Sequence, residues 1–342
     1  MRTPLAEPNA WLSRFAWITA AATLLLICTG GMVTSKGAGL AVPDWPTSFG
    51  YNMFLFPVSK WVGGIFFEHV HRLIASTVGF LTIILALWAW RVEARRWVRS
   101  LALAALGAVI VQGVLGGLRV TLLQDEIGIF HACLAQAFLA MLIVLALATS
   151  PRWFARDLPN ADEARWLALA VTAMIYLQLA LGATMRHEHR DLAIFDFPTA
   201  YGQWIPDTSD AHLAQINQWR NVRAFSEVTA FHIRLQMAHR FGAVLIAVGV
   251  IAFALRVRRA ARTELNRLSA FWIVLLCAQI TLGAWTIWSN KAADIATAHL
   301  AVGATMLATG VSLCALCFRP ARAIPLAQPS PRFQAMQHAA AP

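Results

Sequence analysis

Long apolar stretches separated by short polar segments run through most of the chain. A helix needs about 20 mostly apolar residues to cross the hydrocarbon core of a bilayer, which is about 30 Å thick. Eight stretches reach or approach that length: Phe15–Ser35, Leu73–Trp90, Leu101–Leu118, Ile127–Ser150, Trp166–Met185, Leu235–Leu255, Leu268–Asn290 and Ile295–Phe318. The alternating pattern of a β-barrel is absent, so helices remain the way to satisfy the backbone in lipid. The pattern predicts an all-α integral membrane protein with eight transmembrane helices.

The composition supports this prediction. Of the 342 residues, 58% are hydrophobic and only 13% are charged, whereas soluble domains carry about 25% charged residues. So few charges cannot coat a water-facing surface, which excludes a soluble enzyme, a disordered protein and a coiled coil. The net charge of +11 would suggest nucleic-acid binding in a soluble chain, but its meaning here depends on where the basic residues lie.

The basic residues mark one side of the membrane. The two tails and the segments 91–99, 150–165 and 256–267 hold 17 of the 28 Lys and Arg residues. The positive-inside rule places these segments, and therefore both termini, in the cytoplasm. In the short N-terminal tail we expect neither a transit peptide nor a cleavable signal. We expect a multi-pass protein of the bacterial cytoplasmic (inner) membrane, surrounded by lipid, with no nucleic-acid partner.

An internal repeat relates the two halves of the chain. The matched segments are Asp44-Trp-Pro-Thr-Ser-Phe-Gly50 with Asp196-Phe-Pro-Thr-Ala-Tyr-Gly202, Gln112-x-x-Leu-Gly-Gly with Gln279-x-x-Leu-Gly-Ala, His71-Arg72 with His239-Arg240, and His131 with His299. An ordered series of matches indicates duplication of a four-helix unit. Because four spans is an even number, both copies have the same orientation, related by a pseudo-two-fold axis along the membrane normal.

This duplication predicts two four-helix bundles side by side. We expect residues 1–155 to form the N-terminal bundle and residues 156–320 the C-terminal bundle, with residues 321–342 as a disordered cytoplasmic tail. The loop from residue 187 to 231 is long, and its role does not follow from the sequence.

Four of the ten histidines are singled out by the repeat: His71, His131, His239 and His299. The two histidines of each half are 60 residues apart and lie near the outer ends of the second and fourth helices of their unit. Two such histidines facing a bundle interior are what axial ligation of a heme iron requires. A hydrogen-bonded core histidine is the ordinary alternative for any one of them. A closed zinc site is less favoured, because it needs four ligands.

Small residues and arginines accompany the histidines. Small pairs occupy the outer ends of all four odd-numbered helices: Gly30-Gly31, Gly116-Gly117, Gly182-Ala183 and Gly283-Ala284. They could admit a porphyrin face or allow close helix contact. Arg72 and Arg240 directly follow ligand candidates, so their guanidinium groups could hold heme propionates. Extension to lipid headgroups is the alternative.

One carboxylate distinguishes the two halves. Glu68 and His71 are at positions i and i+3 and share a helix face, whereas the second half has Gln236 before His239. A carboxylate near a heme can move protons, so the asymmetry favours chemistry at the first site and cofactor holding at the second. The alternative is that Glu68 is a favourable N-terminal helix charge.

With these residues assembled, the chain resembles the heme A synthase family over roughly residues 12–318. The resemblance rests on these segments: Gly37-Ala-Gly-Leu, Pro43-Asp-Trp-Pro, Glu68-x-x-His71-Arg72, Leu115-Gly-Gly-Leu-Arg119, His131, His239-Arg240 and Ala298-His299-Leu. It implies that His71 and His131 flank the substrate heme O and that His239 and His299 ligate a resident heme b. It matches Glu68 to the glutamate that the family requires.

The implied reaction oxidises a ring methyl of heme O through hydroxymethyl to formyl, giving heme A. The implied partners are heme O synthase, the cytochrome oxidase assembly route and an electron-transfer partner, and a homo-oligomer is possible. Some bacterial members carry a cysteine pair in the first outer loop, but residues 36–67 contain none, so no thiol role transfers. Cys314-x-x-Cys317 lies in an apolar helix and is expected to pack.

Two other functions stay open from the sequence. A di-heme electron-transfer protein of cytochrome b type would use both histidine pairs without turnover. A heme transporter or chaperone would exchange heme without altering the porphyrin. Glu68 opposite Gln236 favours the enzyme over both.

Overall fold

The computed structural model describes residues 8–154, 162–188, 190, 192–259 and 263–319, and the expected tail at 321–342 lies outside them. The helices long and apolar enough to cross a membrane are α1 (Ala10–Ser35), α2 (Gly63–Val92), α3 (Arg96–Leu122), α4 (Asp125–Ala148), α6 (Asp162–His187), α8 (Ala230–Arg259), α9 (Thr263–Trp288) and α10 (Ala293–Cys317). Each of the eight predicted spans is therefore confirmed as a helix of a multi-pass membrane protein.

The helices extend past the predicted apolar stretches at their polar ends. α2 begins at Gly63 and includes Glu68, as the shared helix face of Glu68 and His71 predicted, and α8 begins at Ala230, before the apolar stretch that starts at Leu235. Glu68 and Gln236 therefore lie inside helices. Short elements fill the segments between spans: the 3-10 turns η1 (Met53–Leu55) and η2 (Val58–Lys60), and the helices α5 (Pro151–Phe154) and α7 (Asp210–Val222).

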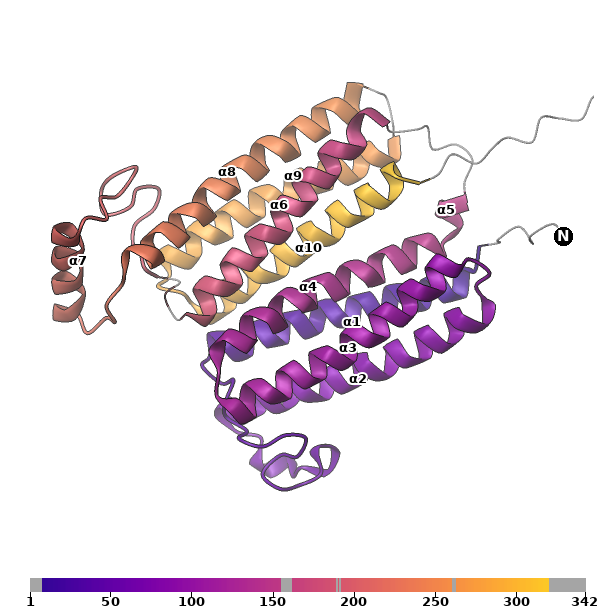
Figure 1. The fold of residues 1–342 in the computed structure, drawn as a ribbon, viewed down its shortest axis with the longest axis horizontal. Coiled ribbons are helices and arrows are strands. Elements are labelled where there is room, and N and C mark those ends of the chain that lie inside the picture. Colours follow the sequence, from indigo (N-terminus) through magenta and orange to yellow (C-terminus); the bar gives the residue numbers. More distant parts are fainter. Residues whose placement is uncertain (1–7, 155–161, 189, 191, 260–262, 320–342) are drawn as a thin grey trace, which may run out of the picture.

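The eight long helices form two groups that follow the duplication. Figure 1 shows α1–α4 on one side and α6, α8, α9 and α10 on the other. Each group has its own buried hydrophobic cluster, centred on residues such as Leu142 in the first and Trp272 in the second. α1 and α4 contact α10, and α4 also contacts α6, so these four helices join the halves.

A glycine allows one of these inter-half contacts. A Cβ added at Gly31 of α1 would lie 2.8 Å from Cδ2 of Leu300 in α10. That distance is shorter than carbon atoms tolerate without displacement, so a larger residue would require the Leu300 side chain or one of the helices to move. Small residues serve membrane helix packing in this way generally.

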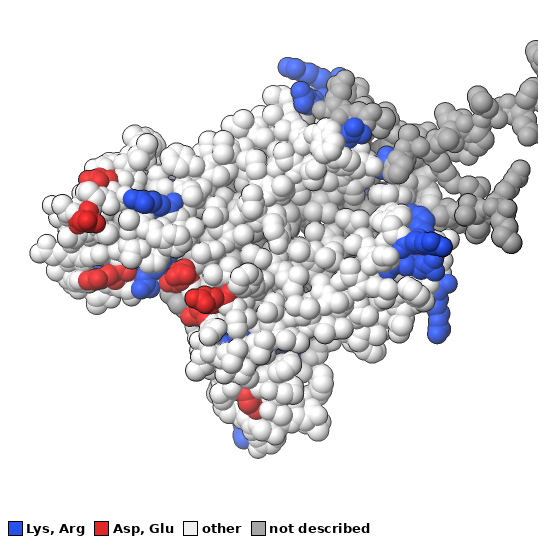
Figure 2. Space-filling model, viewed as in Figure 1, with Lys and Arg blue, Asp and Glu red and all other residues white. Residues whose placement is uncertain are grey.

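The two ends of the molecule differ in charge and in the segments that lie over the helix ends. Residues 36–62 and α7 lie at one end, hereafter the loop end, and the described N-terminal residues lie at the other (Figure 1). On the face shown in Figure 2, the visible Asp and Glu side chains lie at the loop end together with some Lys and Arg, whereas Lys and Arg without Asp or Glu are visible at the opposite end. The segment from residue 190 to 228 has a small apolar cluster of its own, which includes Ile194, Ile216 and Val228.

Candidate functional site

Each of the four repeat histidines faces a glycine of a neighbouring helix. The distance from a Cβ built on the glycine to Cε1 of the imidazole is 3.0 Å for Gly30 and His71, 3.3 Å for Gly116 and His131, 3.5 Å for Gly182 and His239, and 3.1 Å for Gly283 and His299. The first small residue of each pair therefore makes room for an imidazole. This arrangement repeats four times. It is a close contact between neighbouring helices, one of the two alternatives for these positions, and whether a porphyrin face also lies there stays a prediction.

The histidine pair of the second half fits one metal atom. The imidazole ring centres of His239 and His299 are 6.5 Å apart, with 60° between the ring planes. Two metal–imidazole bonds of about 2 Å each place ring centres roughly 6 Å apart. Nδ1 of both rings is buried without a hydrogen-bond partner. Each ring thus keeps one nitrogen whose hydrogen-bonding capacity the protein does not use.

The first-half histidines differ in how their rings are held. The hydroxyl of Thr29 donates to the Leu26 carbonyl at 2.9 Å and lies 3.1 Å from Nδ1 of His71. Because that hydroxyl hydrogen is already used, the oxygen accepts from Nδ1–H, and Nε2 becomes the basic nitrogen. Such a partner fixes the tautomer and orientation of a ligating imidazole. Nδ1 of His131 is buried and unpartnered.

Glutamine side chains hold the helices beside the histidines. Nε2 of Gln112 donates to the His131 carbonyl at 3.0 Å, and Nε2 of Gln178 donates to the His239 carbonyl at 2.6 Å. Gln279, the repeat partner of Gln112, has Nε2 3.4 Å from Nε2 of His299. These amides anchor helix backbone or ring at three of the four histidines.

The donor set suits axial ligation better than a closed metal site. Among the described residues, no group of three or more His, Cys, Asp or Glu side chains is arranged to hold a metal ion. Structural zinc needs four such ligands, whereas a heme iron supplies its own four equatorial nitrogens and needs only axial ligands. The glycine recesses, unpartnered ring nitrogens and paired imidazoles therefore fit heme.

Glu68 lies at the first site but bonds to the loop that covers it. The carboxylate is 4% exposed. Its Oε2 accepts from Val42 N at 2.8 Å, and its Oε1 lies 2.7 Å from Nη2 of Arg72. Arg72 in turn donates to the carbonyls of Val42, Asp44 and Thr47. We call Glu68 and Arg72, with the backbone of residues 42–47, the first loop clamp.

The second half builds the same clamp without the carboxylate. Oε1 of Gln236 accepts from Ile194 N at 2.8 Å, and its Nε2 lies 3.3 Å from the Ile194 carbonyl. Arg240 donates to the carbonyls of Asp196 and Thr199 at 2.6 and 2.8 Å. These two side chains with residues 194–199 form the second loop clamp. Gln236 therefore takes both the accepting role of Glu68 and one donating role of Arg72.

The clamps give Arg72 and Arg240 partners that the sequence did not suggest. Both terminal nitrogens of each guanidinium are used by loop carbonyls, so neither side chain extends to lipid headgroups. Nε of Arg240 is buried without a partner and is the nitrogen left for a propionate. The propionate contacts of these two arginines stay a prediction.

Each clamped loop is a tight turn organised by an aspartate. The side chain of Asp44 accepts from Phe49 N, Gly50 N and the Thr47 hydroxyl, and Asp196 makes the same three contacts in the second half. Partial burial acts against ionisation, but these hydrogen bonds prevail and hold the pKa of both carboxyls below the usual value. Trp45 of the first turn packs on Gly117, where a Cβ would lie 2.4 Å from its ring.

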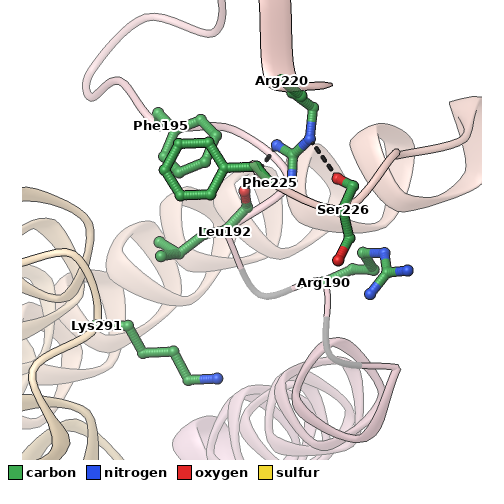
Figure 3. Close-up of a pocket in the computed structure, with 7 residues that line it drawn as sticks. All are labelled: Arg190, Leu192, Phe195, Arg220, Phe225, Ser226 and Lys291. Carbon is green, nitrogen blue, oxygen red and sulfur yellow. Dashed lines mark hydrogen bonds between the residues drawn. The ribbon is translucent and has the colours of Figure 1, made fainter. Parts of the chain in front are cut away.

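One cavity among the described residues is lined by none of the four repeat histidines. It has a volume of about 180 Å³ and is lined by Arg190, Leu192, Phe195, Arg220, Phe225, Ser226 and Lys291. Figure 3 shows the Arg220 guanidinium beside two aromatic rings. It donates to the Ser226 carbonyl at 2.7 Å and to the Leu192 carbonyl at 3.2 Å. Arg220 therefore fastens the 190–228 segment rather than presenting a free cation.

The sequence did not predict two features of this region. Thr29, the hydrogen-bond partner of His71, belongs to no motif, and the helix α7 has no apolar stretch that would mark it. The loop clamps have a signal in the sequence, since Asp44 and Thr47 recur as Asp196 and Thr199, but recurrence alone does not show which groups these residues contact. Cys314, which the sequence treated as a packing residue, has its sulfur 3.3 Å from the hydroxyl of Thr172.

Comparisons with known proteins place this site in context. Residues 51–311 match the COX15-CtaA family, described as cytochrome oxidase assembly protein. The chain is 26% identical to the heme A synthase of Shewanella oneidensis, over 89% of this chain and 94% of the relative. It is 29% identical to that of Shouchella clausii, over 69% and 73%, and 31% identical to that of Halalkalibacterium halodurans, over 57% and 66%.

Proposed function

Because the chain belongs to the COX15-CtaA family of cytochrome oxidase assembly proteins, the heme A synthases, we propose that it oxidises a ring methyl of heme O to a formyl group. Its role is heme A biosynthesis for oxidase assembly. The methyl carbon passes through hydroxymethyl. The first oxidation takes up one water molecule, whose oxygen becomes the hydroxyl group, and each of the two oxidations passes two electrons to an electron-transfer partner and releases two protons.

The two histidine pairs take different parts in this proposal. His71 and His131 flank the substrate heme O, and His239 and His299 ligate a resident heme b, which supplies redox chemistry when bound. The glycine recess opposite each imidazole and the 6.5 Å ring separation in the second half support these assignments. The chain's own contribution is to bind and orient two porphyrins and to exclude water around them.

The observation that carries the catalytic proposal is the contrast between Glu68 and Gln236. Gln236 holds its loop with the same backbone contact, to the residue equivalent to Val42. An amide is therefore sufficient for the clamp, and the fold alone does not require a carboxylate at position 68. We assign Glu68 the role of accepting a proton from the substrate carbon or its hydroxyl.

The membrane orientation also belongs to the proposal. The charge difference between the two ends (Figure 2) supports a cytoplasmic location for both termini. The loop end then faces the outer side of the bacterial cytoplasmic membrane. Heme O synthase would supply the substrate, and cytochrome oxidase assembly would consume the product.

The decisive experiment is co-expression of the full chain with an enzyme that makes heme O, followed by chromatography of the extracted hemes. We expect heme A or its hydroxymethyl precursor to accumulate. A profile that contains only heme O and heme b would eliminate the enzyme.

A di-heme electron-transfer protein is the second candidate, and the near identity of the two loop clamps favours it. Such a protein would bind two hemes and change oxidation state, but every extracted porphyrin would keep its methyl group. The same chromatography therefore separates the two functions.

A further inference from the structure

His187, the last residue of α6, is a buried histidine outside the repeat, and its place in the fold is unusual. It belongs to the second half but packs against α4 of the first half. A Cβ built on Gly128 would lie 2.4 Å from its Cε1 and 2.5 Å from its Nδ1. This is a fifth glycine recess that receives an imidazole, and it crosses the boundary between the halves.

The imidazole of His187 is left with unused hydrogen-bonding capacity. The residue is 8% exposed, and its Nδ1 is buried with no partner. A buried polar nitrogen without a partner costs free energy, so its retention calls for a ligand. Gly128 is one helical turn before His131, which places His187 beside the substrate-heme site on the loop-end side.

The surroundings of His187 are cationic. The ionisable groups in electrostatic contact with it are Arg119, Arg186, Asp125 and His131. Arg119 also acts electrostatically on His71 and His131, so it is the cation shared by both first-site histidines. Its guanidinium lies 3.6 Å from the carboxylate of Asp125. A carboxylate ligand would meet this positive group at the edge of the porphyrin.

The neighbouring Arg186 fixes the end of α6 against the first half. Its Nη2 donates to the Gly31 carbonyl at 2.6 Å and also contacts the Ser35 hydroxyl. Gly31 directly follows the glycine that faces His71. Arg186 therefore contacts α1 and His187 contacts α4. These are the two first-half helices at the inter-half boundary, and both contacts lie close to the first-site histidines.

We propose that His187 completes the substrate site by donating a hydrogen bond to a propionate carboxylate of the porphyrin held between His71 and His131. The proposal rests on the proposed function for the identity of the substrate. It makes the second half part of the substrate site, and it supplies the propionate contact for which Arg72 has no free terminal nitrogen.

The test is a spectroscopic titration of the purified full chain, carrying its resident heme, with heme O and separately with heme O dimethyl ester. We expect His187→Leu to weaken heme O binding by about tenfold or more, the contribution of one hydrogen bond to a charged group. The ester, whose carboxylates are blocked, should bind wild type and variant alike. His187→Gln, which keeps a donor, should recover most of the affinity.

His232→Leu is the matched control, because His232 lies at the loop end of α8 in the second half, beside the hydroxyl of Thr229. It should leave heme O affinity unchanged. Equal weakening of acid and ester by His187→Leu would show that the side chain only packs, and unchanged affinity would show no role; either result overturns the proposal. An unaltered resident-heme spectrum reports that the variant has folded.

Turnover is measured separately in the wild type. Carboxylate-dependent binding through His187 with no conversion of heme O would remove the proposed enzyme but keep the binding site. Conversion of heme O, with an affinity that does not depend on His187, would keep the proposed enzyme but remove the binding role of His187.

Discussion

The two halves of the molecule perform the same structural task with different chemistry. In the first half, a buried ion pair between Glu68 and Arg72 fastens the covering loop to α2. In the second, the neutral amide of Gln236 fastens the equivalent loop to α8 through the same backbone position. Because burying a charge pair incurs a desolvation penalty, the neutral version is the simpler way to hold a loop.

The histidine rings show a second difference between the halves. Thr29 orients His71 through Nδ1, whereas the equivalent position in the second half is Leu181, and Nδ1 of His239 has no partner. The first site thus has both a carboxylate and an oriented ring. The comparison teaches that the two halves share a scaffold, and the polar groups present only in the first half support the proposal that reaction takes place there.

Loss of a histidine should have the largest effect on heme binding and conversion, and the effect should differ completely between the two halves. His239→Ala should abolish the resident-heme spectrum, and His71→Ala should leave that spectrum but stop heme O conversion. Loss of a residue that only hydrogen-bonds a ligating side chain lowers metal affinity or activity about 10–100-fold. Loss of the ligating histidine itself should have a larger effect. Absorption spectra and extracted-heme chromatography measure the two outcomes. A resident-heme spectrum that survives His239→Ala would contradict the assignment.

Substitution of Glu68 should separate clamping from chemistry. Glu68→Gln should keep the free energy of unfolding within about 1 kcal/mol, because Gln236 shows that an amide holds the loop, but should lower conversion roughly 100-fold or more. Glu68→Ala should in addition destabilise the protein by about 3 kcal/mol, since it leaves the buried Val42 N–H and the Arg72 guanidinium without the acceptor oxygen at position 68 that glutamine retains. Thermal unfolding and heme chromatography distinguish these effects.

Gln236→Ala is the matched control for that series. It should loosen the second loop without changing the chemistry of the first site. If Glu68→Gln kept full conversion, Glu68 would be only a clamp residue, and the difference between the halves would lose its catalytic meaning.

Alanine at the glycine recesses should have a smaller, graded effect. Gly30→Ala places a Cβ 3.0 Å from His71, whereas Gly182→Ala places it 3.5 Å from His239. We expect Gly30→Ala to weaken the free energy of heme binding at its site by about 1–3 kcal/mol, the usual range for overpacking. Gly182→Ala should leave that free energy nearly unchanged. Heme affinity from spectral titration measures both. Gly79→Ala, with no atom within 4 Å of the new Cβ, is the control; an effect as large as that of Gly30→Ala would refute the steric explanation.

Acidification should produce the smallest effect, confined to the loops. The pKa values of Asp44 and Asp196 are lowered in the folded state by hydrogen bonds that prevail over partial burial. Their contribution to stability is therefore present above the unfolded pKa of about 3.9 and is lost as the pH falls through the lower folded value. Fluorescence of Trp45, which packs on Gly117, should report loosening of the first turn.

Asp44→Asn should remove that part of the fluorescence transition, and Asp196→Asn should leave it intact because Trp45 belongs to the first turn. A transition unchanged in Asp44→Asn would assign the loosening to other groups.

The sequence determined the class of protein, the eight spans, the duplication and the four histidines. Apolar length, charge distribution and recurrence along the chain are local properties, and lipid makes them strongly constraining because every backbone group must be satisfied within a helix. The helix starts at Gly63 and Ala230 were less accessible, because polar residues near the boundary carry no apolar signal.

The tertiary structure alone decided what the polar residues touch. Whether Arg72 meets a propionate, a headgroup or a loop carbonyl depends on a turn 28 residues away in sequence, and the place of His187 depends on how two bundles pack. Such contacts join positions distant along the chain, and their strength comes from burial that only packing creates. The sequence therefore identified the groups capable of chemistry, and the fold determined which of them are occupied in holding the structure.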